Sequence, residues 1–328
     1  MKKRALVTGI TGQDGAYLAK LLLEKDYEVY GFASRRVNQN YSNTDYLGIT
    51  GKIKFVHGDV TDISSVNHAI KVSRPHEFYN LAAMSFVGLS WQEPIHTANV
   101  DAMGPLYIME SLRQHSPDTK FYQASTSEMY GNSYEDNHTQ NELTPMRPRS
   151  PYGFSKVFAH NAVVNYRDSY SLYATSGILF NHESPIRGKE FVTRKITDGV
   201  ARIKAGLQDT IELGNLDPRR DWGFAGDYVE AMWLMMQQDT PEDYVISTGK
   251  TWSIKELCNA AFSAAGIDNW EDKIVTNPAF VRPAELYYLK GDSTKAKEKL
   301  GWEPSVSFEE VITMMVQADM ERYNYPFQ

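Results

Sequence analysis

Short apolar runs alternate with amphipathic stretches along the first part of the chain, up to residue 187. The runs are typical of strands buried on both faces, and the stretches between them carry apolar residues at helical spacing. No hairpin signal separates the elements, so the alternation predicts an α/β protein with a doubly wound parallel sheet. Strands are predicted at residues 4–8, 28–32, 52–57, 77–81, 120–123 and 173–180. Helices are predicted at residues 16–25, 63–72 and 99–114, and another begins near residue 152.

After residue 187 the pattern becomes shorter and mixed. Amphipathic helices are predicted at residues 191–205, 225–237, 253–265 and 307–323, with a short strand at residues 210–213. We therefore predict two joined domains, residues 1–187 and 188–328, with some segments interleaved. The second is expected to be a smaller, mixed α/β domain that binds substrate.

The composition is that of an ordinary globular protein, with 42% hydrophobic and 23% charged residues in a chain of 328. A net charge of −7 argues against a general nucleic-acid or acidic-membrane surface. The single cysteine, Cys258, excludes an internal disulfide framework and a thiolate metal cage. The first residues run directly into a strand pattern, and no apolar run approaches the roughly 18 residues of a membrane span. We expect a soluble, cytoplasmic protein without a metal site.

A glycine-rich loop, Gly9-Ile-Thr-Gly12-Gln-Asp-Gly15, joins the first strand to the first helix. Glycines in this setting let the backbone approach a pyrophosphate, which rests on the helix N-terminus. The spacing is GxxGxxG rather than GxGxxG, and a tight turn without a ligand is the alternative. The context of strand, loop and helix favours dinucleotide binding by a Rossmann-like first domain.

The end of the second strand indicates which dinucleotide is bound. An NAD enzyme usually carries Asp or Glu there for the ribose hydroxyls. This chain carries Arg35 and Arg36, which suit a ribose phosphate and favour NADP, with a solvated basic turn as the alternative. Asp59, after the third strand, is placed to reach the adenine. The small residues 82–85 after the fourth strand leave room for the cofactor.

Four residues carry candidate acid–base chemistry. Tyr152 and Lys156 are four apart and share a face if a helix begins there. A nearby ammonium favours the phenolate, so Tyr152 is expected to act as a base well below the solution pKa of about 10. Thr126 and Glu128 are two apart at the end of the fifth strand, so both are expected to point to one side. A helix-capping or solvated role is the alternative for Glu128.

Ligands of doubly wound sheets bind at the carboxyl ends of the strands. The predictions place Gly9, Arg35, Asp59, Ala82 and Thr126 at those ends, which strengthens the case for the acid–base pair.

Further polar residues lie later in the chain. His182 follows the sixth strand and is either a ligand contact or a structural histidine. Lys195, Arg219, Arg220 and Arg282 come from three separate segments and could together bind a second phosphate-bearing ligand.

The glycine loop, Asp59, Thr126 and the Tyr152/Lys156 pair resemble those of the extended short-chain dehydrogenase/reductases, which include nucleotide-sugar epimerases, dehydratases and reductases. Longer strings are similar to the GDP-mannose 4,6-dehydratase family, and the similarity runs nearly the whole chain. These strings are Thr8-Gly-Ile-Thr-Gly-Gln-Asp-Gly15, Ala124-Ser-Thr-Ser-Glu-Met-Tyr-Gly131, Leu179-Phe-Asn-His-Glu-Ser-Pro-Ile-Arg-Gly188 and Arg220-Asp-Trp-Gly-Phe-Ala-Gly-Asp-Tyr-Val229. Met84 and His96 depart from the Gln and Tyr common in the family.

The resemblance implies a dehydration of GDP-D-mannose to GDP-4-keto-6-deoxy-D-mannose by internal hydride transfer through tightly bound NADP. The match to Tyr152 takes the proton of the hexose 4-hydroxyl, and the match to Lys156 holds the nicotinamide ribose. The match to Thr126 hydrogen-bonds the sugar, and the match to Glu128 removes the carbon 5 proton and helps expel the 6-hydroxyl. The implied cofactor contacts are Gly9, Thr11, Gly12, Gln13, Asp14, Gly15, Arg35, Arg36, Asp59, Val60, Leu81, Ala82, Ala83, Ser85, Tyr152, Lys156, His182 and Arg187. The implied substrate contacts are Ser85, Asn181, Lys195, Arg220, Arg282 and Glu285.

Other functions remain open from the sequence. A GDP-heptose is an alternative substrate, and a GDP-sugar reductase or epimerase on the same scaffold is an alternative enzyme. A non-catalytic NADP sensor is a third alternative, although it has no use for a paired acid and base. Glu128 favours the dehydratase, because an elimination requires a group that abstracts the carbon 5 proton. The resemblance further implies a homo-oligomer, either a dimer or a tetramer.

Overall fold

The computed structural model describes residues 2–34, 40–134, 138–280 and 284–325. Three residues singled out above, Arg35, Arg36 and Arg282, lie outside the described residues.

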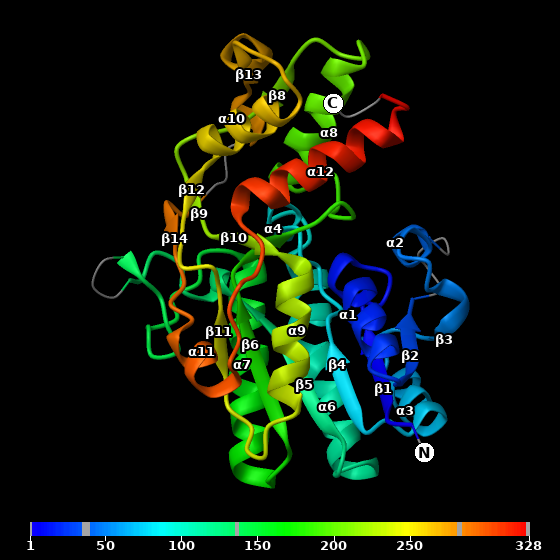
Figure 1. Ribbon diagram of the computed structural model, residues 1–328. Helices are drawn as coiled ribbons and strands as arrows, with labels where there is room; N and C mark the ends of the chain where they lie inside the picture. Colours follow the sequence, from blue (N-terminus) through cyan, green and yellow to red (C-terminus); the bar gives the residue numbers. More distant parts are fainter. Residues whose placement is uncertain (1, 35–39, 135–137, 281–283, 326–328) are drawn as a thin grey trace.

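A seven-stranded parallel sheet forms the centre of the larger part of the molecule, in the order β11-β6-β5-β4-β1-β2-β3 (Figure 1). This arrangement confirms the predicted doubly wound α/β fold. All six predicted strands are present, and the seventh, β11, was not predicted because its apolar run is only three residues long. The strands are β1 (Arg4–Thr8), β2 (Glu28–Ala33), β3 (Lys54–His57), β4 (Glu77–Asn80), β5 (Lys120–Thr126), β6 (Ala174–Leu179) and β11 (Tyr244–Ile246).

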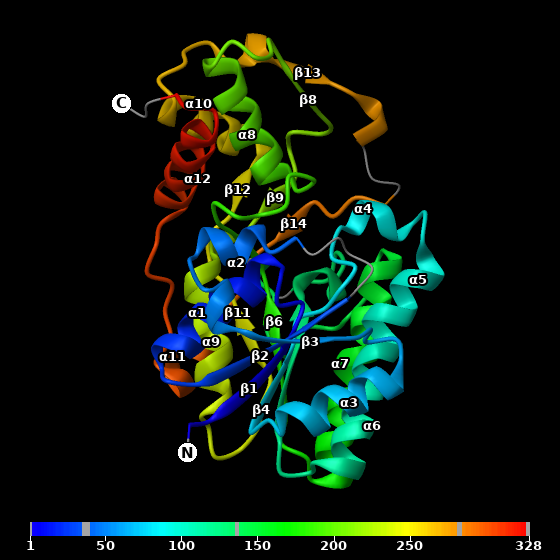
Figure 2. The same ribbon diagram turned by 90° about the vertical axis from the view of Figure 1, so that its right-hand side faces the viewer.

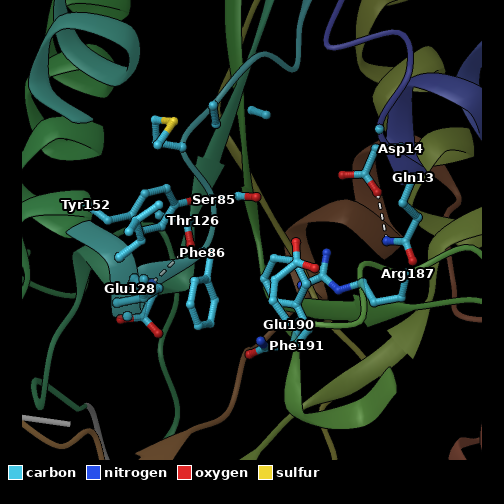
Figure 3. A pocket seen from close by; sticks show the side chains of 18 of the residues that line it. Gln13, Asp14, Ser85, Phe86, Thr126, Glu128, Tyr152, Arg187, Glu190 and Phe191 are labelled. Carbon is cyan, nitrogen blue, oxygen red and sulfur yellow. Dashed lines mark hydrogen bonds between the residues drawn. The ribbon is translucent and has the colours of Figure 1, made fainter. Parts of the chain in front are cut away.

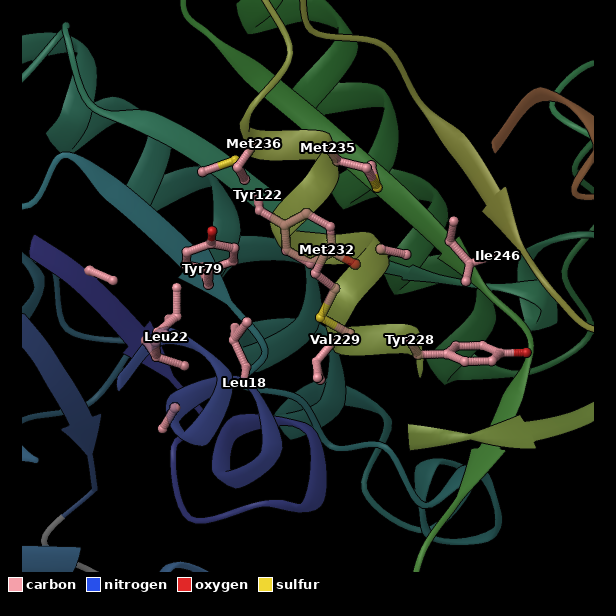
Figure 4. Close-up of a cluster of buried hydrophobic side chains, with 14 of the residues drawn as sticks. Leu18, Leu22, Tyr79, Tyr122, Tyr228, Val229, Met232, Met235, Met236 and Ile246 are labelled. Carbon is pink, nitrogen blue, oxygen red and sulfur yellow. The ribbon is translucent and has the colours of Figure 1, made fainter. Parts of the chain in front are cut away.

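Helices cover both faces of this sheet, because successive strand side chains point to opposite sides. On one face, Tyr79 and Tyr122 pack against Leu18 and Leu22 of α1 and against the methionines of α9 (Figure 4). On the other face of the sheet, Phe78 and neighbouring apolar side chains of the strands pack against the second layer of helices. The first layer contains α1 (Gln13–Glu24), α9 (Ala225–Met236) and α11 (Thr294–Leu300). The second layer contains α3 (Ile63–Ser73), α6 (Gly104–His115) and α7 (Pro151–Tyr170).

A smaller part lies over the carboxyl ends of the large sheet (Figures 1 and 2). Its core is formed by α8 (Val192–Lys204), α10 (Ile254–Ala264) and α12 (Phe308–Arg322). A buried ion pair between Arg194 and Asp319, 2.7 Å apart, joins α8 to α12. Three small sheets complete the smaller part. Two of them pair β7 (Asn181–Glu183) with β10 (Trp222–Phe224), and β8 (Ile211–Leu213) with β13 (Ile274–Thr276). In the third, β9 (Arg219–Arg220) lies between β12 (Trp252–Ser253) and β14 (Tyr288–Leu289).

The chain crosses between the two parts several times. Although α9, β11 and α11 come after residue 188, they pack on the large sheet. The boundary at residue 187 stays a prediction.

The predicted helix at residues 99–114 has a more complex form. It is a continuous helical stretch that begins with α5 (Pro94–Ala98), passes through a π-helical turn at Asn99–Met103 and continues as α6. Two further short helices, α2 (Ser42–Tyr46) and α4 (Val87–Ser90), lie in connecting segments. Within the described ranges, no helix is long and apolar enough to cross a membrane.

Candidate active site

A cavity of about 1500 Å³ is lined by residues at the carboxyl ends of the large sheet and by residues of the smaller part of the molecule. Apart from Arg219, every site residue predicted from the sequence that the structure describes lines this cavity. They are Gly9, Thr11, Gly12, Gln13, Asp14, Gly15, Asp59, Val60, Leu81, Ala82, Ala83, Ser85, Thr126, Glu128, Tyr152, Lys156, Asn181, His182, Arg187, Lys195, Arg220 and Glu285. The chain thus brings these segments into one space, although the roles of individual residues remain predictions.

The glycine-rich loop has the backbone that the sequence analysis requires. Gly9 has a positive φ of 65°, and a Cβ there would lie 2.8 Å from the Leu81 backbone. A Cβ on Gly15 would lie only 2.2 Å from the carbonyl oxygen of Gly9. Gly12 is the N-cap residue of α1 and has no side chain to accept hydrogen bonds from the first backbone amides of the helix. This end of the helix lines the cavity. The loop fits a pyrophosphate at the helix N-terminus.

The residues of this loop also hold the smaller part of the molecule in place. The Gln13 amide donates to the His182 carbonyl at 3.1 Å and accepts a hydrogen bond from the Ser184 hydroxyl at 2.7 Å. Asp14 lies 2.9 Å from Nε2 of His182, whose Nδ1 lies 2.8 Å from the Phe180 carbonyl. Both ring nitrogens therefore donate when His182 is protonated, and its ring also stacks on Tyr228.

Opposite charge sets the protonation of this pair. Burial alone would raise the pKa of Asp14, but the charge and hydrogen bond of His182 outweigh burial and lower the pKa to about 2. Burial likewise works against a charged His182, but Asp14 prevails and the pKa of His182 is raised above its usual 6.5. His182 is therefore a hydrogen-bonded histidine of the cavity wall whose protonated form Asp14 favours.

Tyr152 and Lys156 lie in the first turns of α7, which begins at Pro151. The Ser150 hydroxyl caps this helix by accepting from the Gly153 amide at 3.0 Å. Lys156 is buried, donates to the Ala124 carbonyl at 3.1 Å, and its Nζ lies 5.7 Å from the centre of the Tyr152 ring. The helix therefore places the phenol and the ammonium on one face, as predicted.

The expected lowering of the Tyr152 pKa is not found. Burial raises the pKa of Tyr152 well above 10, and the charges of Asp101 and Glu128 raise it further, while Thr126 acts in the opposite direction. Burial also lowers the pKa of Lys156, although Asp101 supports its charge. The ammonium of Lys156 favours the phenolate, but the cost of removing a phenolate from water is larger.

Thr126 and Glu128 share one side for a reason that differs from the predicted one. The strand ends at Thr126, and Glu128 lies in a tight 3-10 turn, Ser127–Met129. The Thr126 hydroxyl accepts a hydrogen bond from the Glu128 amide at 3.3 Å, which fixes the turn. Both side chains are about nine-tenths buried and line the cavity (Figure 3), so Glu128 is not a solvated surface residue.

Asp101 was missed by the sequence analysis. It lies in the π-helical turn, is fully buried, and accepts a hydrogen bond from the Met84 amide at 2.8 Å. Burial raises the pKa of Asp101, while Lys156 and His96 lower it, so it lies near the acid–base pair. An acidic residue in an otherwise apolar helical stretch was the available signal.

The far end of the cavity carries polar groups from the smaller part. Asn181 has a buried Oδ1 without a hydrogen-bond partner among the described residues, as expected of a group that meets a ligand. Arg220 lies 3.4 Å from Glu285, and the Lys195 ammonium lies 3.4 Å above the Phe280 ring.

Arg219 does not belong to this group. Its guanidinium bonds to Thr251 and pairs with Glu256, and it does not line the cavity. It alternates with Arg220 along β9, so the two side chains leave opposite faces of the strand. The prediction that it joins the cationic cluster is wrong.

Apolar lining residues were also missed. These are Phe86 and Phe191, which line the cavity and contact each other. Met84 and His96, noted above as departures from the family, line it as well. In a sequence, a phenylalanine is usually interpreted as a core residue, so only the fold shows that it lines a cavity. Within the described residues, no three His, Cys, Asp or Glu side chains gather as a metal site would require.

Comparisons with known proteins agree with this geometry. A family model described as GDP-mannose 4,6 dehydratase matches residues 6–315. GDP-mannose 4,6 dehydratase 1 of Arabidopsis thaliana is 49% identical, covering 98% of this chain and 90% of the relative. GDP-mannose 4,6 dehydratase of Homo sapiens is 46% identical, covering 97% and 91%. The structure of Thermus thermophilus UDP-glucose 4-epimerase in complex with NAD has a TM-score of 0.84 and 26% identity, covering 96% and 98%.

Proposed function

The chain belongs to the GDP-mannose 4,6-dehydratase family, and on that premise we propose that it converts GDP-D-mannose to GDP-4-keto-6-deoxy-D-mannose with loss of water. The observation that carries the proposal is the placement of Glu128 in one cavity with Tyr152, Lys156 and Thr126. An alcohol dehydrogenase or an epimerase needs the last three, whereas an elimination also needs a base for carbon 5.

We propose a nicotinamide dinucleotide, specifically NADP, as the cofactor. The glycine loop, with its room for a pyrophosphate, supports a dinucleotide, and a structural relative carries NAD. The preference for NADP rests on the sequence positions of Arg35 and Arg36. When bound, the nicotinamide supplies an acceptor and donor of hydride, and its positive ring favours a nearby phenolate.

The side chains of the cavity divide the proton transfers between them. Tyr152 accepts the proton of the 4-hydroxyl, and Thr126 donates a hydrogen bond to the same oxygen. Lys156 keeps a positive charge beside the phenol and thereby lowers the cost of the phenolate. Once carbon 4 has also lost its hydride, the resulting 4-ketone acidifies carbon 5. Glu128 takes the carbon 5 proton and passes it to the 6-hydroxyl, which leaves as water. Return of a hydride to carbon 6 and of a proton to carbon 5 gives the 4-keto-6-deoxy product. Asn181, Lys195 and Arg220 hold the GDP-sugar, with its phosphates on the cations.

The location and assembly of the protein are further proposals. We place the reaction in the cytoplasm, in line with the single buried Cys258, and in a homo-oligomer, as the resemblance implies.

Mass spectrometry of the product tests the proposed reaction. Incubation of the purified protein with GDP-mannose should give a sugar nucleotide lighter by one water, without net consumption of added NADPH. Glu128→Gln should keep cofactor binding and reduce the dehydration rate by about 10²–10⁴-fold, because it removes the base but keeps the shape. Glu230→Gln, on the exposed face of α9, is the matched control and should retain full activity.

Two results would contradict the proposal. Steady oxidation of NADPH together with a reduced product would identify a reductase. A fully active Glu128→Gln would show that another group abstracts the proton.

A further inference from the structure

Two phenylalanines meet across the cavity. Phe86 comes from the segment after β4 and precedes α4, and Phe191 precedes α8 in the smaller part. Their ring centres are 5.9 Å apart with the planes at 82°, an edge-to-face contact. Both rings line the cavity, so the contact crosses the space that separates the large sheet from the smaller part.

The fold places Phe86 beside the proposed proton abstractor. Strands β4 and β5 are neighbours, with Asn80 paired to Gln123, so the segments that leave their carboxyl ends emerge side by side. One segment leads to Phe86 and the other to Glu128. In Figure 3 the Phe86 ring lies between the group formed by Thr126, Glu128 and Tyr152 and the side of the cavity that carries Phe191.

Contacts with charged residues hold the ring of Phe191 in place. The guanidinium of Arg187 lies 3.6 Å from the centre of its ring, and Nε of Arg187 lies 3.2 Å from the buried carboxylate of Glu183. Glu183 also accepts a hydrogen bond from the Thr193 hydroxyl. A cation stacked on one face of the ring and anchored by a buried carboxylate holds the ring in place. Phe86 therefore meets a fixed partner.

Core packing does not explain Phe86, because 41% of its surface is exposed. A partly exposed apolar ring that faces a cavity contributes little to folding but offers a flat wall to a ligand.

The proposed chemistry indicates which part of the sugar this wall meets. If Glu128 removes the carbon 5 proton, carbon 6 lies one bond away from that position. A substituent on carbon 6 then points toward whatever borders Glu128 within the cavity. We propose that Phe86, backed by Phe191, is a specificity-determining residue that closes the sugar site beyond carbon 6 and admits hexoses but excludes sugars with an added hydroxymethyl group there. The inference rests on the proposed dehydration.

Paired substrates test this inference. The probes are GDP-mannose and a GDP-linked manno-heptose, which differs by one hydroxymethyl group on carbon 6, and the readout is the ratio of their kcat/KM values. The wild-type protein should favour GDP-mannose. Phe86→Ala should raise the heptose-to-mannose ratio by about 10–200-fold, the range for one added carbon group in an apolar pocket. Phe191→Ala should change the ratio in the same direction.

A control variant and a second substitution at residue 86 separate an effect on specificity from an effect on folding. Leu207→Ala removes an exposed apolar side chain outside the cavity and should leave the ratio unchanged. If Phe86→Ala does not fold, Phe86→Leu carries the same test with a smaller loss of volume. A ratio within twofold of wild type in the folded Phe86 variant, or equal use of both sugars by wild type, would overturn the inference. Failure of wild type to dehydrate GDP-mannose would instead refute the proposed function.

Discussion

Replacing Asp14 by asparagine should destabilise the protein in a way that depends on pH. Asp14 and His182 form an ion pair between the glycine loop and β7, with 22% and 10% of their side chains exposed. The pKa of Asp14 falls from 3.8 to about 2 in the folded chain. At 1.36 kcal/mol for each pKa unit, this difference corresponds to ~2 kcal/mol of folding free energy.

The direction of the pH dependence follows from the pKa shifts of both partners. The folded pKa of Asp14 is lowered, so its contribution is present above pH 3.8 and is lost as the pH falls through about 2. The folded pKa of His182 is raised, so its contribution is complete below pH 6.5 and is lost as the pH rises through the folded value. The pair therefore stabilises the chain most between these two limits. The two shifts describe one interaction and do not add.

Urea unfolding of wild type and Asp14→Asn, without cofactor, measures the effect. We expect a loss of ~2 kcal/mol at about pH 5.5, and a smaller loss at alkaline pH, because the contribution of His182 is lost as the pH rises through its raised folded pKa. The asparagine keeps the side-chain size and an oxygen that can accept from Gln13, so the charge is the main change.

Asp26→Asn provides a matched control. Asp26 pairs with Lys2 at the surface, with 76% of its side chain exposed, and has a positive φ of 63° that asparagine tolerates. Its substitution should change the stability by less than about 0.5 kcal/mol at either pH. An equal loss for Asp14→Asn at both pH values, or no loss at about pH 5.5, would refute the role of the ion pair.

Two further predictions concern the cofactor. Gly15→Ala should weaken NADPH binding about tenfold or more in a fluorescence titration, because a Cβ 2.2 Å from the Gly9 oxygen forces the loop to shift at a cost of ~1–3 kcal/mol. Gly51→Ala, where nothing lies within 4 Å of the added Cβ, is its control, and equal affinities of the two variants would contradict the prediction. Arg35→Ala should weaken NADP by ~1.5–3 kcal/mol more than NAD, as expected for loss of a charged contact to the ribose phosphate. Equal losses in calorimetric titrations of the two cofactors would count against that contact.

Periodicity along the chain was sufficient to predict the sheet and most of its helices. Buried strands and amphipathic helices are local patterns, and parallel strands bring their carboxyl ends to one edge whatever the details of packing. For this reason the sequence alone predicts one common site for Gly9, Asp59 and Thr126, which are far apart in the chain. All three line the same cavity.

Other features depend on contacts between distant segments. The three residues of β11 carry too little pattern to predict a strand, and they form one because β6 offers its free edge. The side chain of Phe86 faces the cavity because β4 and β5 are neighbours. The pKa of Tyr152 rises because burial and the carboxylates of Asp101 and Glu128 act together on the phenol.

Spacing along one helix could bring Lys156 beside Tyr152, since four residues make about one turn. It could not bring Asp101 there or remove water from the site, because both depend on how separate helices and strands pack. Local periodicity therefore predicted which residues reach the cavity, whereas their charge states and the shape of the sugar site follow from the packing of segments that are distant in the chain.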